Sequence, residues 1–175
     1  MLRRTTPPRS RGLSPNNGFY PADDAPEIDE ADWKLEVSGL VEDRTPWTIQ
    51  RLRQLPQEGQ ITRHIRIEGW SAIGSWSGVP LRVLLERIGA DTKAKYVGFK
   101  CADRSYSSLD MPSALHPQTI LALDFAGQPL PTEFGFSLKV RVPTKLAFKS
   151  PKFVRALFVT NGYWEDQCYN WFSGS

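Results

Sequence analysis

The sequence is poor in the residues that most often hold metals or form cross-links. It contains two cysteines, Cys101 and Cys168, and two histidines, His64 and His116. Two cysteines cannot build a disulfide framework, and a single bridge cannot be inferred without the distance between their Cα atoms. The motifs C-x-x-C and H-E-x-x-H, the P-loop and G-x-G-x-x-G do not occur. We therefore expect neither a zinc cluster nor a nucleotide site of these kinds.

The sequence also lacks a long apolar run and a strong charge of either sign. No segment approaches the roughly 18 consecutive apolar residues that a membrane-spanning helix needs. The formal net charge is +3 for 175 residues, and outside the N-terminal tip the basic residues are spread along the chain. This balance indicates no nucleic-acid partner.

Proline, glycine and tryptophan are abundant, with 14, 13 and 6 copies against 2 methionines. This composition favours short strands, many turns and an aromatic interior over a helical bundle. Hydrophobic residues make up 40% of the chain and charged residues 23%, which is ordinary for a globular domain. We expect one α+β domain that is mainly β-sheet, with an all-β sandwich or barrel as the alternative.

The first fifteen residues differ from the rest of the chain. Residues 1–15 are basic and rich in proline and serine, so they cannot bury enough apolar surface to offset the entropy of ordering. We expect a disordered basic tail over 1–15 and one domain over 16–175. Arg3 and Arg4 resemble the start of an export signal, but the apolar stretch that must follow is absent. The sequence as written predicts a cytoplasmic protein, and a lost or processed export segment would instead predict a periplasmic one.

Apolar periodicity predicts about eight short strands and one convincing helix. The expected strands are 33–37, 47–49, 60–67, 96–101, 106–109, 119–125, 138–143 and 154–160. The helix is expected at 80–88, with Pro80 at its start and Gly89 just past its end. A shorter helix is expected at 48–55, and one helical turn at 112–115.

The segment Thr62–Leu81 has the sequence TRHIRIEGWSAIGSWSGVPL, which concentrates glycine and tryptophan. Glycine allows backbone conformations that a Cβ atom forbids and lets a ligand approach the main chain. Indole rings provide flat walls with one N–H donor each. The segment therefore predicts either the wall of a pocket for a large, flat, polar ligand or a tight turn inside the core.

A second cluster is basic: Lys139, Arg141, Lys145, Lys149 and Lys152 fall within fourteen residues. A phosphate dianion is bound best by several donors at once, from lysine, arginine and backbone N–H groups. The cluster therefore predicts a phosphate site. The alternative is a solvated sheet edge, where lysine commonly prevents aggregation.

Eight segments in order resemble the molybdopterin-binding domain of the sulfite-oxidase superfamily. They are NNGFYPADDAPEID, WKLEVSGLV, ITRHIRIEGWSAIGSWSGVPL, AKYVGFKCAD, LHPQTILAL, GQPLP, LKVRVPTKLAFKSPK and GYWEDQCYNWFSG. The likeness is greatest to bacterial sulfite-oxidase-like oxidoreductases, which are related to periplasmic methionine-sulfoxide-reducing molybdoenzymes. The resemblance implies the mixed, mainly β sulfite-oxidase fold around one molybdenum cofactor.

The resemblance also implies which residues bind the cofactor. The implied positions are Asn17 and Tyr20 beside the pterin, Cys101 and His116 near the cofactor, Lys139 and Arg141 reaching the pterin phosphate, and Ser150 and Lys152 in the loop that binds this phosphate. Read without the resemblance, Cys101 is as well explained as an inert buried thiol and His116 as a core or capping residue.

The metal-ligand position departs from the family pattern. Relatives bind molybdenum through a cysteine two positions before the glutamate of an E-G/A-W-S motif, and here that cysteine is replaced by Arg66 before Glu68. Arginine stays protonated and has no lone pair to donate, so it cannot replace a thiolate. Arg66 and Glu68 are the implied catalytic positions, with no protein ligand to the metal. Glu68 is either a general base or a hydrogen-bond partner of a backbone turn.

Three hypotheses follow from Arg66. In the first, the chain binds the cofactor and Arg66 pairs with the anionic groups of the cofactor. In the second, the fold persists as a pseudoenzyme or phosphate-binding module. In the third, Cys101 or Cys168 replaces the metal ligand, which is the least favoured hypothesis because neither cysteine lies in the motif.

The predicted function is thus that of a sulfite-oxidase-like oxidoreductase of the oxygen-atom transfer class, impaired by the missing cysteine, or of a binding module without redox catalysis. The implied substrate is a small oxyanion or a sulfoxide, and the implied electron partner is a haem protein or a membrane subunit. We expect a monomer, because superfamily members that dimerise carry an extra C-terminal domain.

Overall fold

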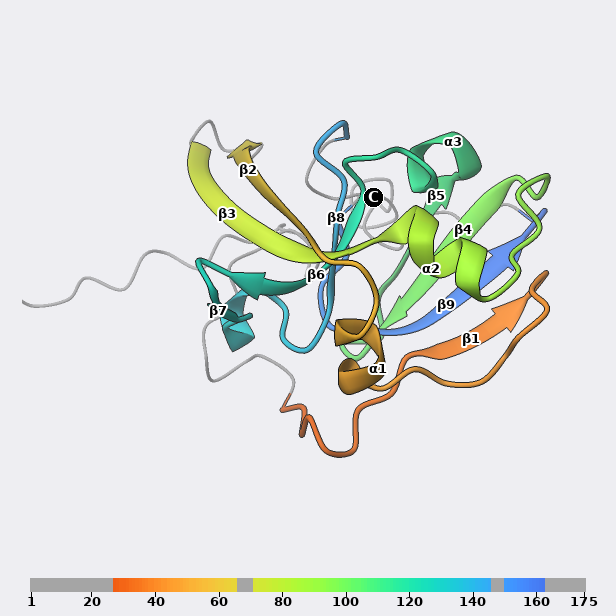
Figure 1. Ribbon diagram of the computed structural model, residues 1–175, viewed down its shortest axis with the longest axis horizontal. Helices are drawn as coiled ribbons and strands as arrows, with labels where there is room; N and C mark the ends of the chain where they lie inside the picture. The colour runs from red at the N-terminus through yellow and green to blue at the C-terminus, as the bar shows by residue number, and fades with distance from the viewer. Residues whose placement is uncertain (1–26, 66–70, 146–149, 163–175) are drawn as a thin grey trace, which may run out of the picture.

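Two β-sheets that share an aliphatic layer form the frame of the molecule (Figure 1). The computed structural model describes residues 27–65, 71–145 and 150–162. Within these residues there are nine strands: β1 (Glu36–Gly39), β2 (Glu58–Ile65), β3 (Ser71–Pro80), β4 (Tyr96–Cys101), β5 (Tyr106–Asp110), β6 (Ile120–Phe125), β7 (Gln128–Pro129), β8 (Lys139–Arg141) and β9 (Val154–Thr160).

The helices are short, and two of them begin with a side-chain cap. The same residues contain α1 (Ile49–Arg53), α2 (Leu81–Arg87), α3 (Met111–Ala114) and the 3-10 helix η1 (Thr132–Phe134). Thr48 Oγ1 accepts a hydrogen bond from the Arg51 N–H at the start of α1. Asp110 caps α3 in the same way by accepting from the Ser113 N–H. None of the helices described is long and apolar enough to cross a membrane.

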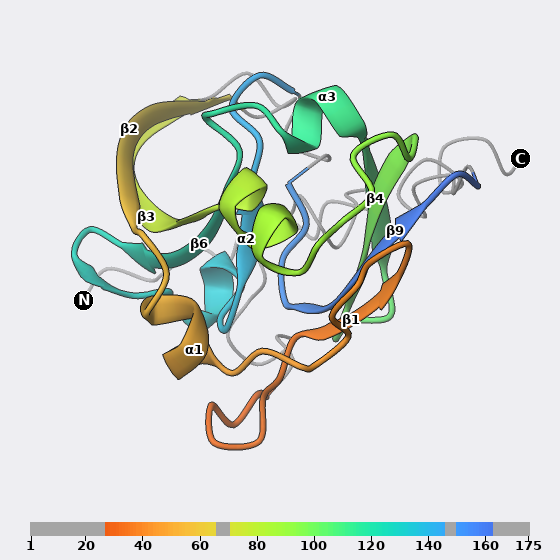
Figure 2. The same ribbon diagram turned by 45° about the vertical axis from the view of Figure 1, so that its right-hand side comes forward.

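The two sheets have different strand orders. The first runs β1-β9-β4-β5, with β1 parallel to β9 and the other pairs antiparallel. The second runs β2-β3-β6-β7, and β8 pairs with β6 as well. Strands β2 and β3 form a long hairpin that curves away from the rest of the sheet (Figure 2). Its last pair, Ile65 with Ser71, flanks the connecting residues 66–70.

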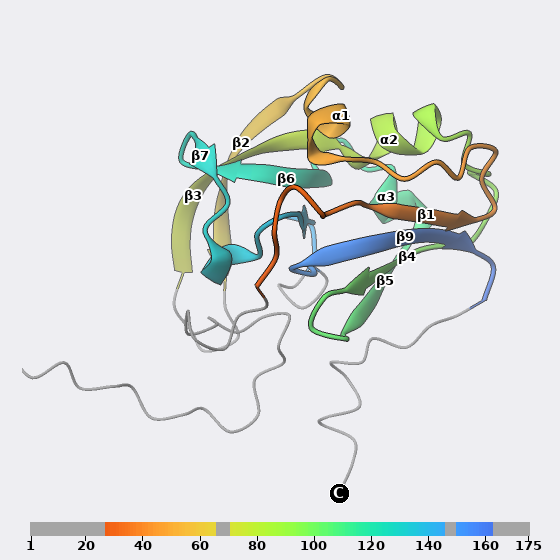
Figure 3. The same ribbon diagram turned by 90° about the horizontal axis from the view of Figure 1, so that it is seen from below.

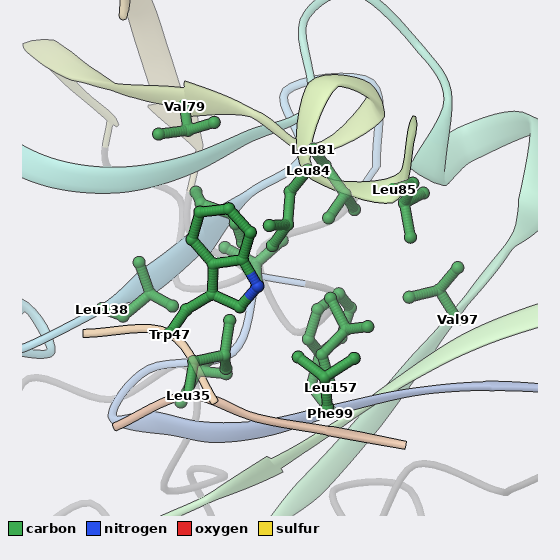
Figure 4. Close-up of a cluster of buried hydrophobic side chains, with 14 of the residues drawn as sticks. Leu35, Trp47, Val79, Leu81, Leu84, Leu85, Val97, Phe99, Leu138 and Leu157 are labelled. Carbon is green, nitrogen blue, oxygen red and sulfur yellow. The ribbon is translucent and has the colours of Figure 1, made fainter. Parts of the chain in front are cut away.

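The main core lies between the sheets and the two larger helices, which cover one side of the molecule (Figure 3). Figure 4 shows Trp47 at the centre of this cluster, among aliphatic side chains from both sheets and from α2. The leucines that gave the helix its periodicity, Leu81, Leu84 and Leu85, are fully buried here. The apolar stripe predicted for α2 is therefore a core face.

A smaller apolar cluster occupies the opposite face of the second sheet. It contains Trp76, Ile120, Ala122 and Leu130, with three partly buried phenylalanines packed against it. The strands β3 and β6 consequently contribute side chains to both clusters. This second face carries the candidate site.

The structure confirms the mainly β, α+β fold class and most predicted elements. The expected strands at 96–101 and 154–160 coincide with β4 and β9. The strand expected at 47–49 is wrong: Trp47 makes only an isolated bridge to Leu35, and Ile49 already belongs to α1. The division into a 1–15 tail and a 16–175 domain stays a prediction, because residues 1–26 and 163–175 lie outside the described part.

The glycine-rich segment differs most from its prediction, because 71–80 is a ten-residue strand rather than a turn. The glycines serve close packing instead. A Cβ atom on Gly74 would lie 2.7 Å from the Phe125 ring, and one on Gly78 would collide with the Leu121 carbonyl of β6. Glycine in a strand interior commonly marks such an approach of a neighbouring backbone or ring.

Candidate cofactor-binding site

The site begins with the alternation of side chains along β8. Leu138, Val140 and Val142 belong to the main aliphatic core, whereas Lys139 and Arg141 project from the opposite face. Lys139 is only 3% exposed and Arg141 only 2%. Alternation of apolar and charged residues usually indicates a strand with one solvent-exposed face, but both faces of β8 are buried.

A tryptophan from β3 forms the floor on which these two cations lie. The Lys139 Nζ is 5.0 Å and the Arg141 Cζ 4.7 Å from the centre of the Trp76 ring. Both distances are within the range of cation–π attraction, which is strongest for tryptophan and for desolvated cations. Phe125 and Phe134 pack on Trp76 with ring centres 4.7 and 6.0 Å away. The face therefore combines flat aromatic walls with fixed positive charge.

The segment 150–153 adds two more polar side chains beside β8. Ser150 Oγ accepts a hydrogen bond from the Val142 N–H at 3.2 Å, and the Pro151 carbonyl accepts one from Val140 at 3.0 Å. Ser150 and Lys152 are 2% and 3% exposed. The segment thus brings a buried hydroxyl and a third buried cation next to Lys139 and Arg141.

The backbone around Lys152 is held in uncommon conformations. Gly135 has a φ of +107°, and a Cβ atom there would lie 2.8 Å from the Cβ of Lys152. Phe153, fully buried, has a φ of +56°. A bulky residue in this left-handed region costs of order 1–3 kcal/mol and persists only where the surroundings enforce it. The position of Lys152 is therefore set by tight packing rather than by a flexible loop.

Burial also changes the acid–base behaviour of the site. It lowers the pKa of the Arg141 guanidinium to about 10, because the charged form loses its hydration. Arg141 nevertheless remains protonated at neutral pH. Buried cations on two adjoining segments, Lys139 and Arg141 on β8 and Lys152 beside it, favour an anion, and a phosphate offers the matching charge and acceptors.

The hydrogen-bonding capacity of this face is consistent with a polar ligand. On this face, Trp76 Nε1 is buried without a hydrogen-bond partner among the described residues. Such groups are uncommon in native structures unless another molecule completes them. The described residues therefore fit a flat, polar group that carries a phosphate.

The structure decides between the two interpretations of the basic cluster residue by residue. Lys139, Arg141 and Lys152 are buried, so a solvated edge is wrong for them. Lys145 is 44% exposed and lies in the turn after β8, with its Nζ 3.8 Å from Asp110 Oδ1. Lys149 lies outside the described residues.

The other predicted site residues are not all brought to this face. Cys101 is 7% exposed and belongs to the main aliphatic core. His116 follows α3, where its Nδ1 accepts a hydrogen bond from the Gln118 N–H at 3.1 Å. Neither placement tests its predicted role. Asn17 and Tyr20, together with the predicted catalytic Arg66 and Glu68, lie outside the described residues.

The sequence did not single out Trp76, Phe134 or Gly135 as part of the site. Trp76 lay in the segment expected to form a flat wall, but its contact with β8 depends on strand order. Phe134 ends η1 and Gly135 follows it, in a segment with no distinctive motif. Within the described residues no group of three histidine, cysteine or acidic side chains could hold a metal ion.

A hollow of about 400 Å³ lies elsewhere, between the loop before β4 and α3. It is lined by Ala94, Tyr96, Met111 and Leu115, with Asp110 at its side. Partial burial opposes ionisation of Asp110, but hydrogen bonds from Ser113 and the nearby Lys145 outweigh it and lower the pKa. Asp110 is therefore an ionised cap of α3, and this hollow lacks the buried cations of the site on β8.

Comparisons with known proteins agree with this description. Residues 22–167 match the family model "Oxidoreductase molybdopterin binding domain". The chain is 59% identical over 165 residues to the "Putative protein-methionine-sulfoxide reductase subunit YedZ1" of Azospira oryzae, covering 92% of this chain and 63% of that protein. It is 33% identical over 168 residues to the "Protein-methionine-sulfoxide reductase catalytic subunit MsrP" of Xanthomonas campestris, covering 82% of this chain and 52% of that one.

A solved structure shares the fold at lower identity. The sulfane dehydrogenase SoxCD of Paracoccus pantotrophus superimposes with a TM-score of 0.73 at 23% identity, over 79% of this chain and 40% of that chain. The chain spans about half to two-thirds of the length of the curated relatives given above. Because the family model matches residues 22–167, which is most of this chain, the chain belongs to the oxidoreductase molybdopterin-binding domain family.

Proposed function

We propose that this chain is the cofactor-binding part of a protein-methionine-sulfoxide reductase in which Arg66 alters the metal coordination. The main support for cofactor binding is the buried pair of Lys139 and Arg141 over the Trp76 ring. Ser150 and Lys152 are buried in the adjoining segment. Two relatives that bear the name of such a reductase, one of them 59% identical, support the choice of substrate.

The described residues have distinct roles in holding the cofactor. Lys152 and the Ser150 hydroxyl would bind the pterin phosphate, with Lys139 and Arg141 supplying further positive charge. The indole of Trp76 keeps these cations in place and excludes water from the site. Because the cations are already desolvated and fixed, little reorganisation is needed when the anion binds.

The cofactor supplies two-electron oxygen-atom chemistry when bound. Reduction of a sulfoxide to a thioether consumes two electrons and two protons and releases water. The electrons must come from a separate donor, for which a haem protein or a membrane subunit is our prediction. In this scheme the protein binds and orients the cofactor and the sulfoxide substrate.

Arg66 sets the limit on this activity. A guanidinium cannot donate a lone pair to a metal, so we expect molybdenum to be bound weakly or without protein sulfur. Cys101 is a poor substitute, since its thiol belongs to the aliphatic core. Arg66 can instead pair with anionic groups of the cofactor, which would preserve binding while changing reactivity.

The test compares cofactor content with metal content. Wild-type protein from a host that makes the cofactor should release pterin at near-stoichiometric amounts but contain little molybdenum. Arg66→Cys should raise both molybdenum content and methionine-sulfoxide reduction. X-ray absorption that shows a protein sulfur bound to molybdenum in the wild-type protein would overturn this account of Arg66.

A second candidate, a phosphate- or cofactor-binding module without redox turnover, is favoured by Arg66 itself. It predicts that Lys152→Ala abolishes ligand binding and that Arg66→Cys changes neither binding nor turnover. Under the first proposal Lys152→Ala also weakens cofactor retention, but Arg66→Cys restores activity. The exposed Lys145→Ala is the matched control in both cases, because it removes a lysine outside the buried face.

A further inference from the structure

The segment that carries Lys152 is anchored through its backbone. The Phe153 N–H donates to the Gly135 carbonyl at 3.3 Å. The Val154 N–H donates to the Leu138 carbonyl at 3.0 Å. Phe153 has a φ of +56°, a conformation that persists only where neighbouring groups enforce it. Every contact that holds Val154 therefore also helps to hold the two residues before it.

One further contact of this segment comes from a tryptophan near the start of the described chain. Trp33 is 4% exposed, and its Nε1–H donates to the Val154 carbonyl at 3.1 Å, in a buried bond between residues 121 positions apart. Figure 3 shows the segment before β1 passing the start of β9, which begins at Val154. The backbone N–H of Trp33 donates in turn to the Asp29 carbonyl at 3.0 Å. Trp33 thus ties a fixed turn before β1 to the residue that follows the strained Phe153.

The indole N–H occupies a place in the sheet that a backbone donor would otherwise fill. β1 and β9 run parallel, with Glu36 beside Ala156. Two residues back in this register Lys34 would lie beside Val154, but β1 begins only at Glu36. The Val154 carbonyl accepts from the side chain of Trp33 at this point. Because a buried carbonyl that loses its partner is costly, the backbone after Lys152 depends on this donor.

A second tryptophan of the same core offers a comparison. Trp47 is also 4% exposed and belongs to the same aliphatic cluster as Trp33. Its Nε1 is buried without a hydrogen-bond partner among the described residues. Both rings therefore fill the core, but of the two it is the N–H of Trp33 that fixes the backbone beside Lys152.

We infer that Trp33 is a positioning residue of the anion site, whose indole N–H holds Val154 and thereby keeps Lys152 in place for the phosphate. The inference rests on the proposed function, in which Lys152 binds the pterin phosphate. Trp33 itself contacts no ligand in this scheme. It restricts the conformations of the segment 152–154, so that more of the protein is competent to bind. Apparent affinity falls in proportion when only a fraction of the protein is binding-competent.

The experiment removes the N–H of Trp33 and measures phosphate binding. Trp33→Phe keeps a buried ring and deletes the donor, and Trp47→Phe is the matched control because it deletes an indole N–H that bonds to none of the described residues. Calorimetric titration of the full chain, prepared without cofactor, with inorganic phosphate gives the affinity of the folded protein well below its unfolding temperature. Retention of pterin by the holoprotein during dialysis is a second measure that needs no turnover.

We expect Trp33→Phe to weaken phosphate binding about fivefold, close to the net effect of one hydrogen bond, and to speed the loss of pterin from the holoprotein. Trp47→Phe should lower the thermal stability but keep the phosphate affinity within about twofold of wild type. If Trp33→Phe proves unfolded, 3-benzothienylalanine in place of Trp33 removes the donor alone, because sulfur replaces the N–H in a ring of the same shape.

A double-mutant cycle tests whether Trp33 acts through Lys152. Lys152→Gln removes the cation that Trp33 positions, so adding Trp33→Phe to it should change phosphate affinity by less than about twofold. In a Lys139→Met background, which lacks a buried lysine of β8 instead, the loss of about fivefold on Trp33→Phe should persist. NMR titration measures the weak affinities of the lysine variants. Where Lys152→Gln binds too weakly to measure, the comparison of Trp33→Phe with Trp47→Phe decides.

Unchanged phosphate affinity without the Trp33 N–H, or an equal loss in Trp47→Phe, would overturn the inference. So would a loss that persists in the Lys152→Gln background, because Trp33 would then act on the core as a whole.

Failure of the proposed function has separate signatures. Phosphate affinity that is indifferent to Lys152→Gln would reject the phosphate site itself. A holoprotein that retains pterin but reduces no methionine sulfoxide with chemical electron donors would reject the reductase. Phosphate binding that depends on Trp33 and Lys152, together with that second result, would retain the positioning role.

Discussion

The two faces of β8 have the same burial but opposite chemistry. Val140 is 0% exposed and Lys139, its neighbour, 3% exposed. Val140 contacts the aliphatic core that joins both sheets, while Lys139 lies over an indole with Arg141 beside it. Three residues of one strand therefore contribute to two environments that differ only in the direction of the side chain.

The difference separates stability from binding. Burying an aliphatic side chain such as Val140 contributes roughly 1.5–3 kcal/mol to the free energy of unfolding. Burying a guanidinium or ammonium group opposes folding unless other interactions offset the lost hydration. The indole of Trp76 supplies part of that offset for Lys139 and Arg141, and a bound anion would add to it. The buried cations thus indicate the site more strongly than the shape of any hollow.

The largest expected effect comes from placing a charge on the wrong face. Val140→Lys should lower the free energy of unfolding by about 3–5 kcal/mol, because the ammonium would enter an aliphatic core without a partner. Lys139→Met, one residue away, should cost far less. Denaturant titration of both variants measures this contrast. Similar losses in the two would show that the faces are not distinct.

A smaller effect, of opposite sign, is expected from removing the charge of Arg141. Its lowered pKa means that the folded state disfavours the protonated form, a cost that is present in full at neutral pH and fades only above about pH 10. Arg141→Met should therefore stabilise the cofactor-free protein by about 1–3 kcal/mol while weakening phosphate binding. Thermal unfolding with and without inorganic phosphate checks both parts; a variant that is less stable and binds phosphate as before would contradict them.

Replacing the floor of the site should have a still smaller effect. Trp76→Phe keeps an aromatic ring but weakens its attraction for Lys139 and Arg141, which should cost about 1 kcal/mol of stability and a few-fold in anion affinity. Trp47→Phe, in the aliphatic core, is the matched control: it should cost stability without changing anion binding. Equal anion affinity in wild-type and Trp76→Phe protein would remove the indole from the site.

Most of the fold was predictable because it depends on local patterns. The helix at α2 follows from leucine spacing between Pro80 and Gly89, and β4, β6 and β9 follow from apolar runs bounded by turns. The strand β3 was not predicted, because its glycines are also typical of turns. A glycine-rich strand differs from a glycine-rich turn here because the neighbouring strand β6 approaches Gly78 closely. The local sequence does not reveal this neighbour.

The candidate site was predictable in part. The alternation around Lys139 and Arg141 places them on one face, but it cannot tell a wet face from a buried one. Their burial depends on Trp76, which is distant in sequence and reaches β8 only through the order β3-β6-β8. The partnership of β8 with Ser150 and Lys152 likewise depends on backbone hydrogen bonds that no motif specifies.

An exposed ion pair gives the smallest effect and completes the contrast with the buried cations. Arg53 of α1 makes two hydrogen bonds to the Asp124 carboxylate of β6, at 2.9 and 3.0 Å, and these raise the pKa of Arg53. Its side chain is 39% exposed, so water and salt screen the attraction. A double-mutant cycle with Arg53→Gln and Asp124→Asn should give a coupling energy of about 0.2–1 kcal/mol that falls further in high salt. A coupling energy above about 2 kcal/mol that is insensitive to salt would mean that a surface ion pair stabilises this fold as strongly as one buried aliphatic side chain does. The assignment of stability to the aliphatic face of β8 and of binding to its cationic face would then lose its energetic basis.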